Sequence, residues 1–193
     1  MKRKVLIING HPVKNSFNAS LAEAYKKGAS AGGAFIDEII IADLKFDPNL
    51  PLGYSRNTIL EEDLIKAQEK INWADHIVFV HPLWWGSVPA IMKGFLDRVL
   101  LPGFAFKSRP NSLWWDKLLK GKTARIISTM DQPYWWYWLF NGKSGIYQLK
   151  TSTLEYCGIK PVKVTTIGPI KHSKDSFRSN WLSKIENIAR KEV

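Results

Sequence analysis

Five short strand-like segments, each followed by a segment with helical spacing, constrain the fold of this chain more than any other feature. Continuous apolar runs are typical of strands buried on both faces of a parallel sheet. Strands that alternate with amphipathic helices predict an α/β fold with a doubly wound parallel sheet. The five predicted strands are residues 5–8, 35–41, 77–80, 124–128 and 162–167.

Five strands with helical crossovers fit the flavodoxin-like strand order better than a six-stranded dinucleotide-binding sheet. We expect a single domain over residues 1–193, because no linker, repeat or low-complexity tract interrupts the pattern. Gly158 is expected to end a helix, and the preceding Cys157 to be a buried packing residue. The predicted helices begin after Ser16, cover 60–73, begin at Pro89, cover 146–156 and begin near Ser173. The predicted loops are 43–56, 102–122 and 129–138.

Composition narrows the class of protein. The single cysteine excludes a disulfide framework and a cysteine-based metal cluster, and we expect no metal. Four apolar residues after Met-Lys-Arg-Lys are too few for a signal peptide, so we expect a cytoplasmic protein. The net charge of +11 admits a nucleic-acid binder, a contact with anionic membranes or an enzyme with anionic ligands. Because the basic residues are scattered, we favour a solvated surface and expect no nucleic-acid partner.

Ligands of open α/β sheets bind beyond the carboxyl ends of the strands, where the strand order reverses. By this rule the ligand should contact three loops, 10–20, 81–88 and 129–138. The first loop enters a helix whose free N–H groups suit a phosphate, with Ser16 as the N-cap. It lacks the Gly-x-Gly-x-x-Gly pattern of directly bound NAD. An ordinary capped helix without a ligand is an equally good interpretation of this loop alone.

The other two loops are rich in aromatic residues. Trp84 and Trp85 follow a buried strand and cannot both face the core, so at least one lies at the mouth of the predicted site. Their indole rings could flank a planar ligand or pack a subunit interface. Residues 134–138 are all aromatic, which favours a wall of the active site that a second copy partly covers.

These loops together resemble the DT-diaphorase type of NAD(P)H:quinone oxidoreductase, a family that includes bacterial modulators of drug activity and ancillary proteins of potassium-efflux systems. The resemblance extends from Val5 to about Gly158. The motifs that carry it are Gly10-His11-Pro12 with Ser16-Phe17-Asn18, Pro82-Leu83-Trp84-Trp85-Gly86-Ser87-Val88-Pro89-Ala90, Lys93-Gly94-Phe95 and Gly103-Phe104-Ala105-Phe106.

The resemblance implies a two-electron enzyme that passes hydride from NAD(P)H through a bound flavin to a quinone-like acceptor. FAD is the expected flavin and FMN the alternative. A homodimer is also implied, in which Phe106 and Lys107 reach the substrate pocket of the partner. The residues expected to bind the cofactor are His11, Ser16, Phe17, Asn18, Pro82, Leu83, Trp84, Trp85, Gly86, Ser128, Thr129, Met130 and Asp131.

Two departures from the family limit this transfer. The third loop reads Thr129-Met130-Asp131-Gln132-Pro133 where the best-known members have Thr-Gly-Gly, and no histidine lies between Pro133 and Gly158 to complete a proton relay. The catalytic residues therefore stay unassigned, and Tyr134 and Tyr137 are the candidates. Tyr134 is also expected in the substrate pocket. The alternative function is a non-catalytic flavoprotein, either an electron carrier or a regulatory subunit in peripheral contact with a membrane transporter.

Overall fold

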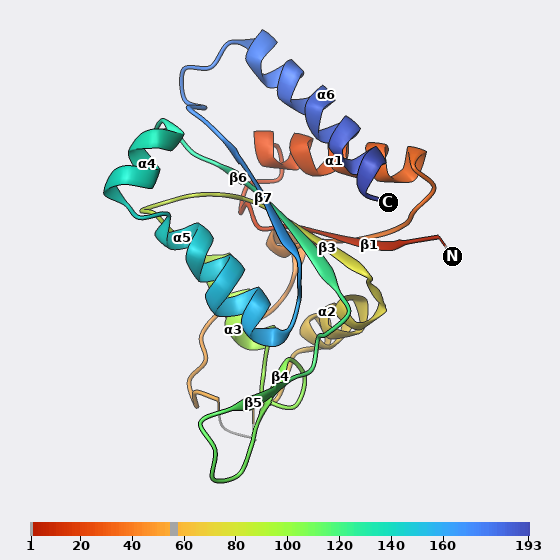
Figure 1. Ribbon diagram of the computed structural model, residues 1–193, viewed down its shortest axis with the longest axis vertical. Coiled ribbons are helices and arrows are strands. Elements are labelled where there is room, and N and C mark those ends of the chain that lie inside the picture. Colours follow the sequence, from red (N-terminus) through yellow and green to blue (C-terminus); the bar gives the residue numbers. More distant parts are fainter. Residues whose placement is uncertain (1, 55–57) are drawn as a thin grey trace.

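A parallel sheet of five strands forms the centre of the molecule (Figure 1). The computed structural model describes residues 2–54 and 58–193, so that the end of the predicted loop 43–56 lies outside the described residues. The strand order is β2-β1-β3-β6-β7, and every neighbouring pair is parallel. This order confirms the predicted flavodoxin-like α/β fold. The strands are β1 (Lys4–Asn9), β2 (Phe35–Ile40), β3 (His76–Pro82), β6 (Thr123–Thr129) and β7 (Val162–Ile167).

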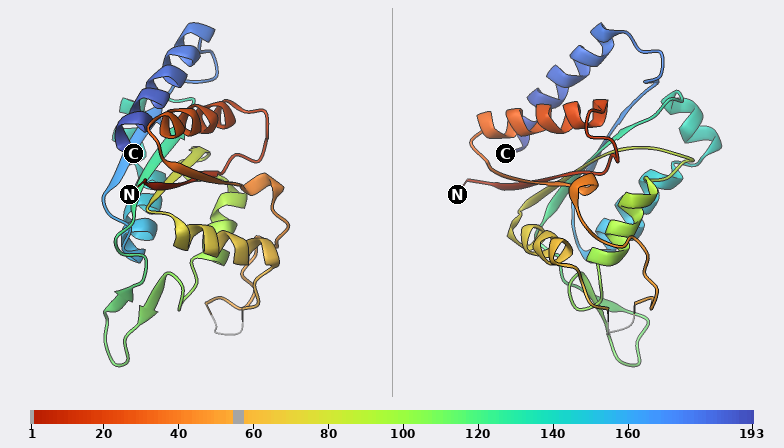
Figure 2. Two further views of the ribbon diagram at one scale, coloured as in Figure 1. Left: turned by 90° about the vertical axis from the view of Figure 1, so that its right-hand side faces the viewer. Right: turned by 180° about the vertical axis from the view of Figure 1, so that it is seen from behind.

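Helices cover both faces of the sheet, as the two views of Figure 2 show. One face carries α1 (Phe17–Ala31) and α6 (Asp175–Glu192), which lie side by side. The other carries α2 (Glu62–Trp73), α3 (Ala90–Val99), and α5 (Ser144–Tyr147) continued by the π-helix η2 (Gln148–Glu155). A short 3-10 turn, η1 (Ile41–Asp43), follows β2.

Alternate residues of β1 supply two separate cores. Val5 and Ile7 pack with α1 and α6, whereas Leu6 and Ile8 pack with α2 and α3. Because successive side chains of a strand point to opposite faces, a strand covered on both sides must be apolar at every position. The continuous apolar runs of the sequence therefore mark the two central strands β1 and β3 correctly.

Two predicted loops contain regular structure. Residues 102–122 include the hairpin of β4 (Phe106–Ser108) and β5 (Trp115–Lys117), which is separate from the main sheet. Residues 129–138 include the start of α4 (Tyr134–Phe140). The prediction of loops was wrong there, because three-residue strands are too short to show alternation and α4, which is aromatic except for Leu139, has no polar face.

Smaller differences concern helix ends. Pro89 is the N-cap of α3 and not a residue of its first turn. The helix predicted over 146–156 begins at Ser144 and is mostly of the π type. Gly158 ends it at a φ of +103°, and Cys157 is buried, as predicted.

A buried ionic network holds α6 against the end of the sheet where the strands begin. The Glu192 carboxylate accepts hydrogen bonds from Arg125 Nε at 2.6 Å and from the Tyr25 hydroxyl at 3.0 Å. Burial raises the pKa of Glu192, but hydrogen bonds from Arg125 and Lys163 outweigh it and bring the pKa to about 2. Burial lowers the pKa of the neighbouring His76 to about 4.

Several basic residues between positions 117 and 125 bind parts of this framework. Arg125 binds Glu192, and Lys122 Nζ donates to the carbonyls of Asn72 and Ala74. Lys117 Nζ donates to the Glu155 carbonyl. These cations are tied to different elements of the fold. No helix among the described residues is both long and apolar enough to cross a membrane.

Candidate functional site

A cleft opens at the carboxyl ends of β1, β3 and β6, where the strand order predicts a ligand. All three predicted loops contribute to it. The residues that line the cleft are His11, Phe17, Asn18, Pro82, Leu83, Trp84, Thr129, Met130, Asp131, Ile170 and Arg178. Among the predicted cofactor residues, Ser16, Trp85, Gly86 and Ser128 stand outside this lining.

Contacts within the first loop fix the protonation state of His11. Val13 N donates to His11 Nδ1 at 2.9 Å, and burial lowers the pKa of the ring. A neutral ring whose Nδ1 accepts carries its proton on Nε2, which is therefore a donor. Ser16 Oγ accepts from Ala19 N at 3.2 Å and caps α1 as predicted. His11 also meets Trp84 edge to face, with 5.6 Å between ring centroids.

Asn18 is the polar residue of the cleft whose bonding is incomplete. Its side chain is 3% exposed, and its Oδ1 accepts from Thr129 Oγ1 at 2.9 Å. Asn18 Nδ2 is buried and has no hydrogen-bond partner among the described residues. An unsatisfied buried donor costs about 1–3 kcal/mol. A ligand acceptor in the cleft would remove this cost.

A tight turn forms the wall opposite the first loop. Trp84 and Ser87 exchange backbone hydrogen bonds of 2.9 and 3.0 Å across Trp85 and Gly86, which both have positive φ. Trp84 borders the cleft, whereas the Trp85 side chain is fully exposed.

Helix α5 supports this turn from behind. Ser144 Oγ donates to the Gly86 carbonyl at 3.1 Å. A Cβ at Gly145 would lie 2.3 Å from the same carbonyl oxygen, so only glycine permits this close approach. The position of the turn is therefore fixed by a segment almost sixty residues away in the sequence.

His81 and Ser128 lie behind the cleft and join β3 to β6. His81 is completely buried, and its Nδ1 lies 2.9 Å from the Pro82 carbonyl oxygen. Because a carbonyl only accepts, Nδ1 carries the proton and Nε2 accepts from Ser128 Oγ at 3.0 Å. Burial lowers the pKa of His81 to about 4. These contacts give His81 a structural role.

The two tyrosine candidates lie in different environments. Tyr137 is 2% exposed, and its hydroxyl accepts from Gly145 N at 3.0 Å and Ile146 N at 3.2 Å. Tyr134 is 47% exposed at the start of α4. Of the two, Tyr134 therefore has the accessible hydroxyl, and Tyr137 fastens α4 to α5.

Arg178 is a site residue that sequence reasoning missed. Its guanidinium lies 5.8 Å from the centre of the Phe17 ring and is held by Ser173 Oγ at 2.9 Å. Of the described residues that line the cleft, it is the one permanent cation. It comes from α6, which carries no recognisable motif, so only the packing of α6 against α1 reveals it.

Phe106 and Lys107 lie away from the cleft of their own chain. They border a larger cavity between α3, η2 and the β4–β5 hairpin. The Phe106 ring packs edge to face on Tyr54 and Tyr156. No group of three or more metal-ligating side chains gathers among residues 2–54 and 58–193.

Comparisons with known proteins agree with this architecture. A family model described as a flavodoxin-like fold matches residues 3–188. An uncharacterized NAD(P)H oxidoreductase of Haemophilus influenzae is 33% identical over 96% of this chain and 92% of that protein. The mouse ribosyldihydronicotinamide dehydrogenase (quinone) is 28% identical over 98% of this chain and 94% of that protein. The crystal structure of Smu.1420 from Streptococcus mutans has a TM-score of 0.84 and 30% identity, covering 97% of this chain and 99% of that one. The chain therefore belongs to the flavodoxin-like family, and within it the chain is similar to NAD(P)H oxidoreductases and quinone-linked dehydrogenases.

Proposed function

We propose that this protein is a flavin-dependent NAD(P)H:quinone oxidoreductase that transfers two electrons as hydride. The observation that carries the proposal is the unsatisfied Asn18 donor in a cleft that also holds a helix N-terminus and the Arg178 cation. The names of the mouse and H. influenzae relatives support the same reaction class.

The residues of the cleft fit a flavin nucleotide. The N-terminus of α1, the His11 Nε2 donor and Arg178 together favour a phosphate group. Trp84 and Leu83 offer an apolar wall for a planar ring system. A bound flavin would supply the hydride chemistry, accepting two electrons from NAD(P)H and giving them to the acceptor.

The third loop would face the polar edge of the ring system. Met130 N already donates to the Ile167 carbonyl at 2.9 Å, so we assign the stabilising role to the amides of Asp131 and Gln132. Tyr134 is the candidate to donate a hydrogen bond to a quinone oxygen. Neutral His81 keeps the ends of β3 and β6 together and needs no proton transfer.

We further propose FAD as the cofactor, with FMN as the alternative, and a homodimer as the working unit. The first loop with its resemblance to DT-diaphorase supports FAD. The hairpin that carries Phe106 and Lys107 supports the dimer, because within one chain these residues are far from the cleft they are expected to serve.

The test is an anaerobic visible spectrum of protein reconstituted with FAD or FMN, before and after addition of NADH or NADPH. We expect bleaching of the flavin absorbance and its recovery when a quinone is added. Flavin that binds but is not reduced would support the carrier or regulatory subunit instead. Failure to bind either flavin would refute the proposal.

A pair of tryptophan variants tests the walls of the cleft. Trp84→Ala should weaken flavin binding, because this side chain lines the cleft. Trp85→Ala removes an equal side chain from the next residue, whose ring is outside the lining, and is the matched control. Equal flavin affinity in both variants would contradict the assignment of Trp84.

A further inference from the structure

Helix α4 presents an almost entirely apolar exterior. Trp135 is 61% exposed and Trp138 53%, and Tyr137 is its one buried residue. A surface helix normally turns a polar face to water, and a helix that is apolar all round is normally covered. We call its exposed residues the aromatic surface: Tyr134, Trp135, Trp136, Trp138, Leu139 and Phe140.

The rings of the aromatic surface are packed against one another. Trp136 lies 5.8 Å from Trp135 and 4.1 Å from Phe140, measured between ring centroids. Below them, the Tyr137 hydroxyl fastens the helix to the backbone of α5. The surface is therefore a supported ridge, and a partner that covers it would bury several large side chains at once.

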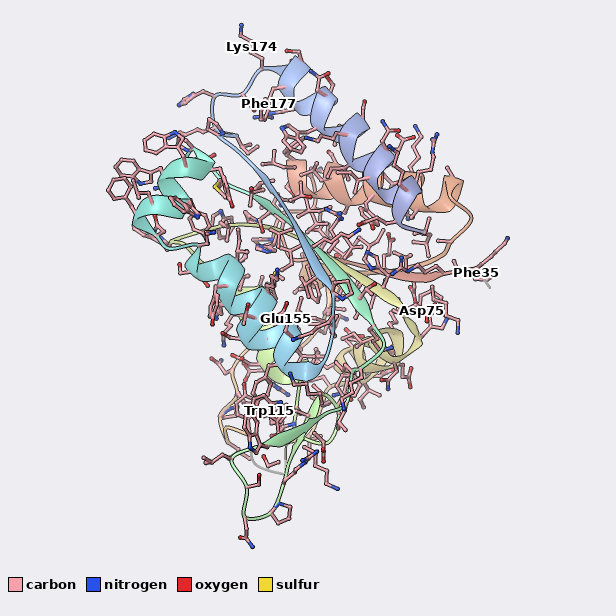
Figure 3. The ribbon with its side chains drawn as sticks, viewed as in Figure 1. Phe35, Asp75, Trp115, Glu155, Lys174 and Phe177 are labelled. Carbon is pink, nitrogen blue, oxygen red and sulfur yellow. The ribbon has the colours of Figure 1, made fainter. Side chains whose placement is uncertain are left out.

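Three lysines lie near this ridge. Lys143 Nζ lies 5.5 Å from the centre of the Trp138 ring. Ile170 N donates to the Met130 carbonyl, which places the loop that carries the exposed Lys171 and Lys174 beside the segment leading into α4. Figure 3 shows Lys174 at this end of the molecule and Trp115 at the opposite end.

The sequence around α4 has the same bias of charge. The two segments beside α4 in the fold, 132–147 and 168–174, contain three lysines and no acidic residue, while Asp131 and Asp175 flank them. The whole chain carries a net charge of +11. The partner of the aromatic surface should therefore be negatively charged at its rim and apolar beneath it.

We propose that the aromatic surface docks on an anionic lipid bilayer. Tryptophan is the residue most suited to the boundary between headgroups and acyl chains, and lysines beside it gain from anionic headgroups. A second copy fits less well, because a symmetric contact would bring the lysines of both copies together. The proposal concerns where the protein acts and goes beyond the reaction proposed above.

Docking would set the candidate site beside the membrane. The 84–87 turn, which borders the cleft through Trp84, contacts α5 through Gly86, and the cleft residue Asp131 lies just before α4. If the proposed function holds, an acceptor dissolved in the bilayer, such as a quinone with a long apolar tail, would reach the cleft without crossing water.

The test measures binding of the purified, flavin-reconstituted protein to vesicles by co-sedimentation. We compare vesicles of phosphatidylcholine alone with vesicles that contain about one quarter phosphatidylglycerol. The protein should bind the anionic vesicles, and 0.5 M salt should weaken this binding. The double variant Trp135→Ser/Trp138→Ser should bind at least tenfold more weakly. Trp114→Ser removes a still more exposed tryptophan, between β4 and β5, and should bind like the parent.

A second pair of variants separates local from overall charge. Each lysine near an anionic surface contributes about fivefold or more to the affinity. Lys171→Glu/Lys174→Glu should therefore lower the affinity for anionic vesicles more than twentyfold. Lys45→Glu/Lys120→Glu changes the net charge equally at exposed positions outside the ridge, and should have a much smaller effect. Circular dichroism checks that each variant is folded.

Three results would overturn the proposal. Folded parent protein that does not bind anionic vesicles excludes bilayer docking. Equal binding by the Trp135→Ser/Trp138→Ser and Trp114→Ser variants places the contact elsewhere. A Trp135→Ser/Trp138→Ser variant that turns from dimer to monomer in analytical ultracentrifugation, with unchanged vesicle binding, assigns the aromatic surface to a second copy. Each of these readouts is independent of flavin reduction.

Discussion

Replacing Asn18 by alanine tests whether this residue contributes to flavin binding or to the stability of the fold. Without flavin, Asn18→Ala loses the hydrogen bond from Thr129, which stabilises the protein by about 1 kcal/mol. It also removes the unsatisfied Nδ2 donor, whose burial costs about 1–3 kcal/mol. These effects oppose each other, so the free energy of unfolding of the apoprotein should rise by no more than about 2 kcal/mol.

Flavin binding should respond very differently. A hydrogen bond to a charged acceptor such as a phosphate contributes about 1.5–3 kcal/mol, so its loss should raise the Kd by roughly 10- to 150-fold. Titration of the apoprotein with FAD and FMN, followed by quenching of flavin fluorescence, gives the Kd. Urea unfolding of the apoprotein gives the stability.

Two further variants make the result decisive. Thr129→Val leaves Nδ2 in place and strips Oδ1 of its partner, so it should lower apoprotein stability by about 1–2 kcal/mol and affect flavin binding less than Asn18→Ala. Asn187→Ala, exposed on α6, should change neither quantity. An Asn18→Ala variant with the parent Kd would refute the assignment of the buried amide to a ligand.

Three other predictions concern groups outside the cleft. His76 and His81 have folded pKa values of about 4 and an ordinary value near 6.5, so the unfolded chain binds more protons between these values. The stability that their burial confers is complete above about pH 6.5 and is lost toward pH 4; a free energy of unfolding that stays flat from pH 7 to pH 5 in urea titrations would contradict this. Glu192→Gln should lower the free energy of unfolding by about 3 kcal/mol, because it leaves the Arg125 guanidinium buried beside a neutral partner. A loss below about 1 kcal/mol would show that the network relaxes. Burial raises the pKa of Cys157 to about 12, so a disulfide reagent at pH 8 should label the native thiol far more slowly than the urea-unfolded thiol, and immediate labelling of native protein would refute its burial.

The central strands were predictable because burial on both faces leaves a continuous apolar run, as at Val5 to Ile8, whereas the edge strands β2 and β7 include charged residues and were placed by their spacing between helices. The cleft was predictable because the strand order alone fixes which loops meet. The β4–β5 hairpin was not, since strands of three residues carry too little pattern. Its aromatic Trp115 is placed by stacking on Tyr156, some forty residues along the chain.

Two features of the site depend on contacts that no local pattern encodes. Arg178 reaches the cleft only because α6 packs along α1, and its neighbours show merely the spacing of an amphipathic helix. Trp84 and Trp85 are identical and adjacent, yet one lines the cleft and the other is fully exposed.

The structure that separates the two tryptophans is a turn with positive φ at Trp85 and Gly86, held by Ser144 and the close approach of Gly145. Tryptophan rarely adopts positive φ, because its Cβ crowds the backbone there. The strain at Trp85 is therefore maintained by α5, and loosening α5 should disturb the wall of the cleft. Gly145→Ala would push the Gly86 carbonyl away and should weaken flavin binding, although residue 145 itself does not line the cleft. A Gly145→Ala variant that binds flavin with the parent affinity would show that the turn holds its shape without this support.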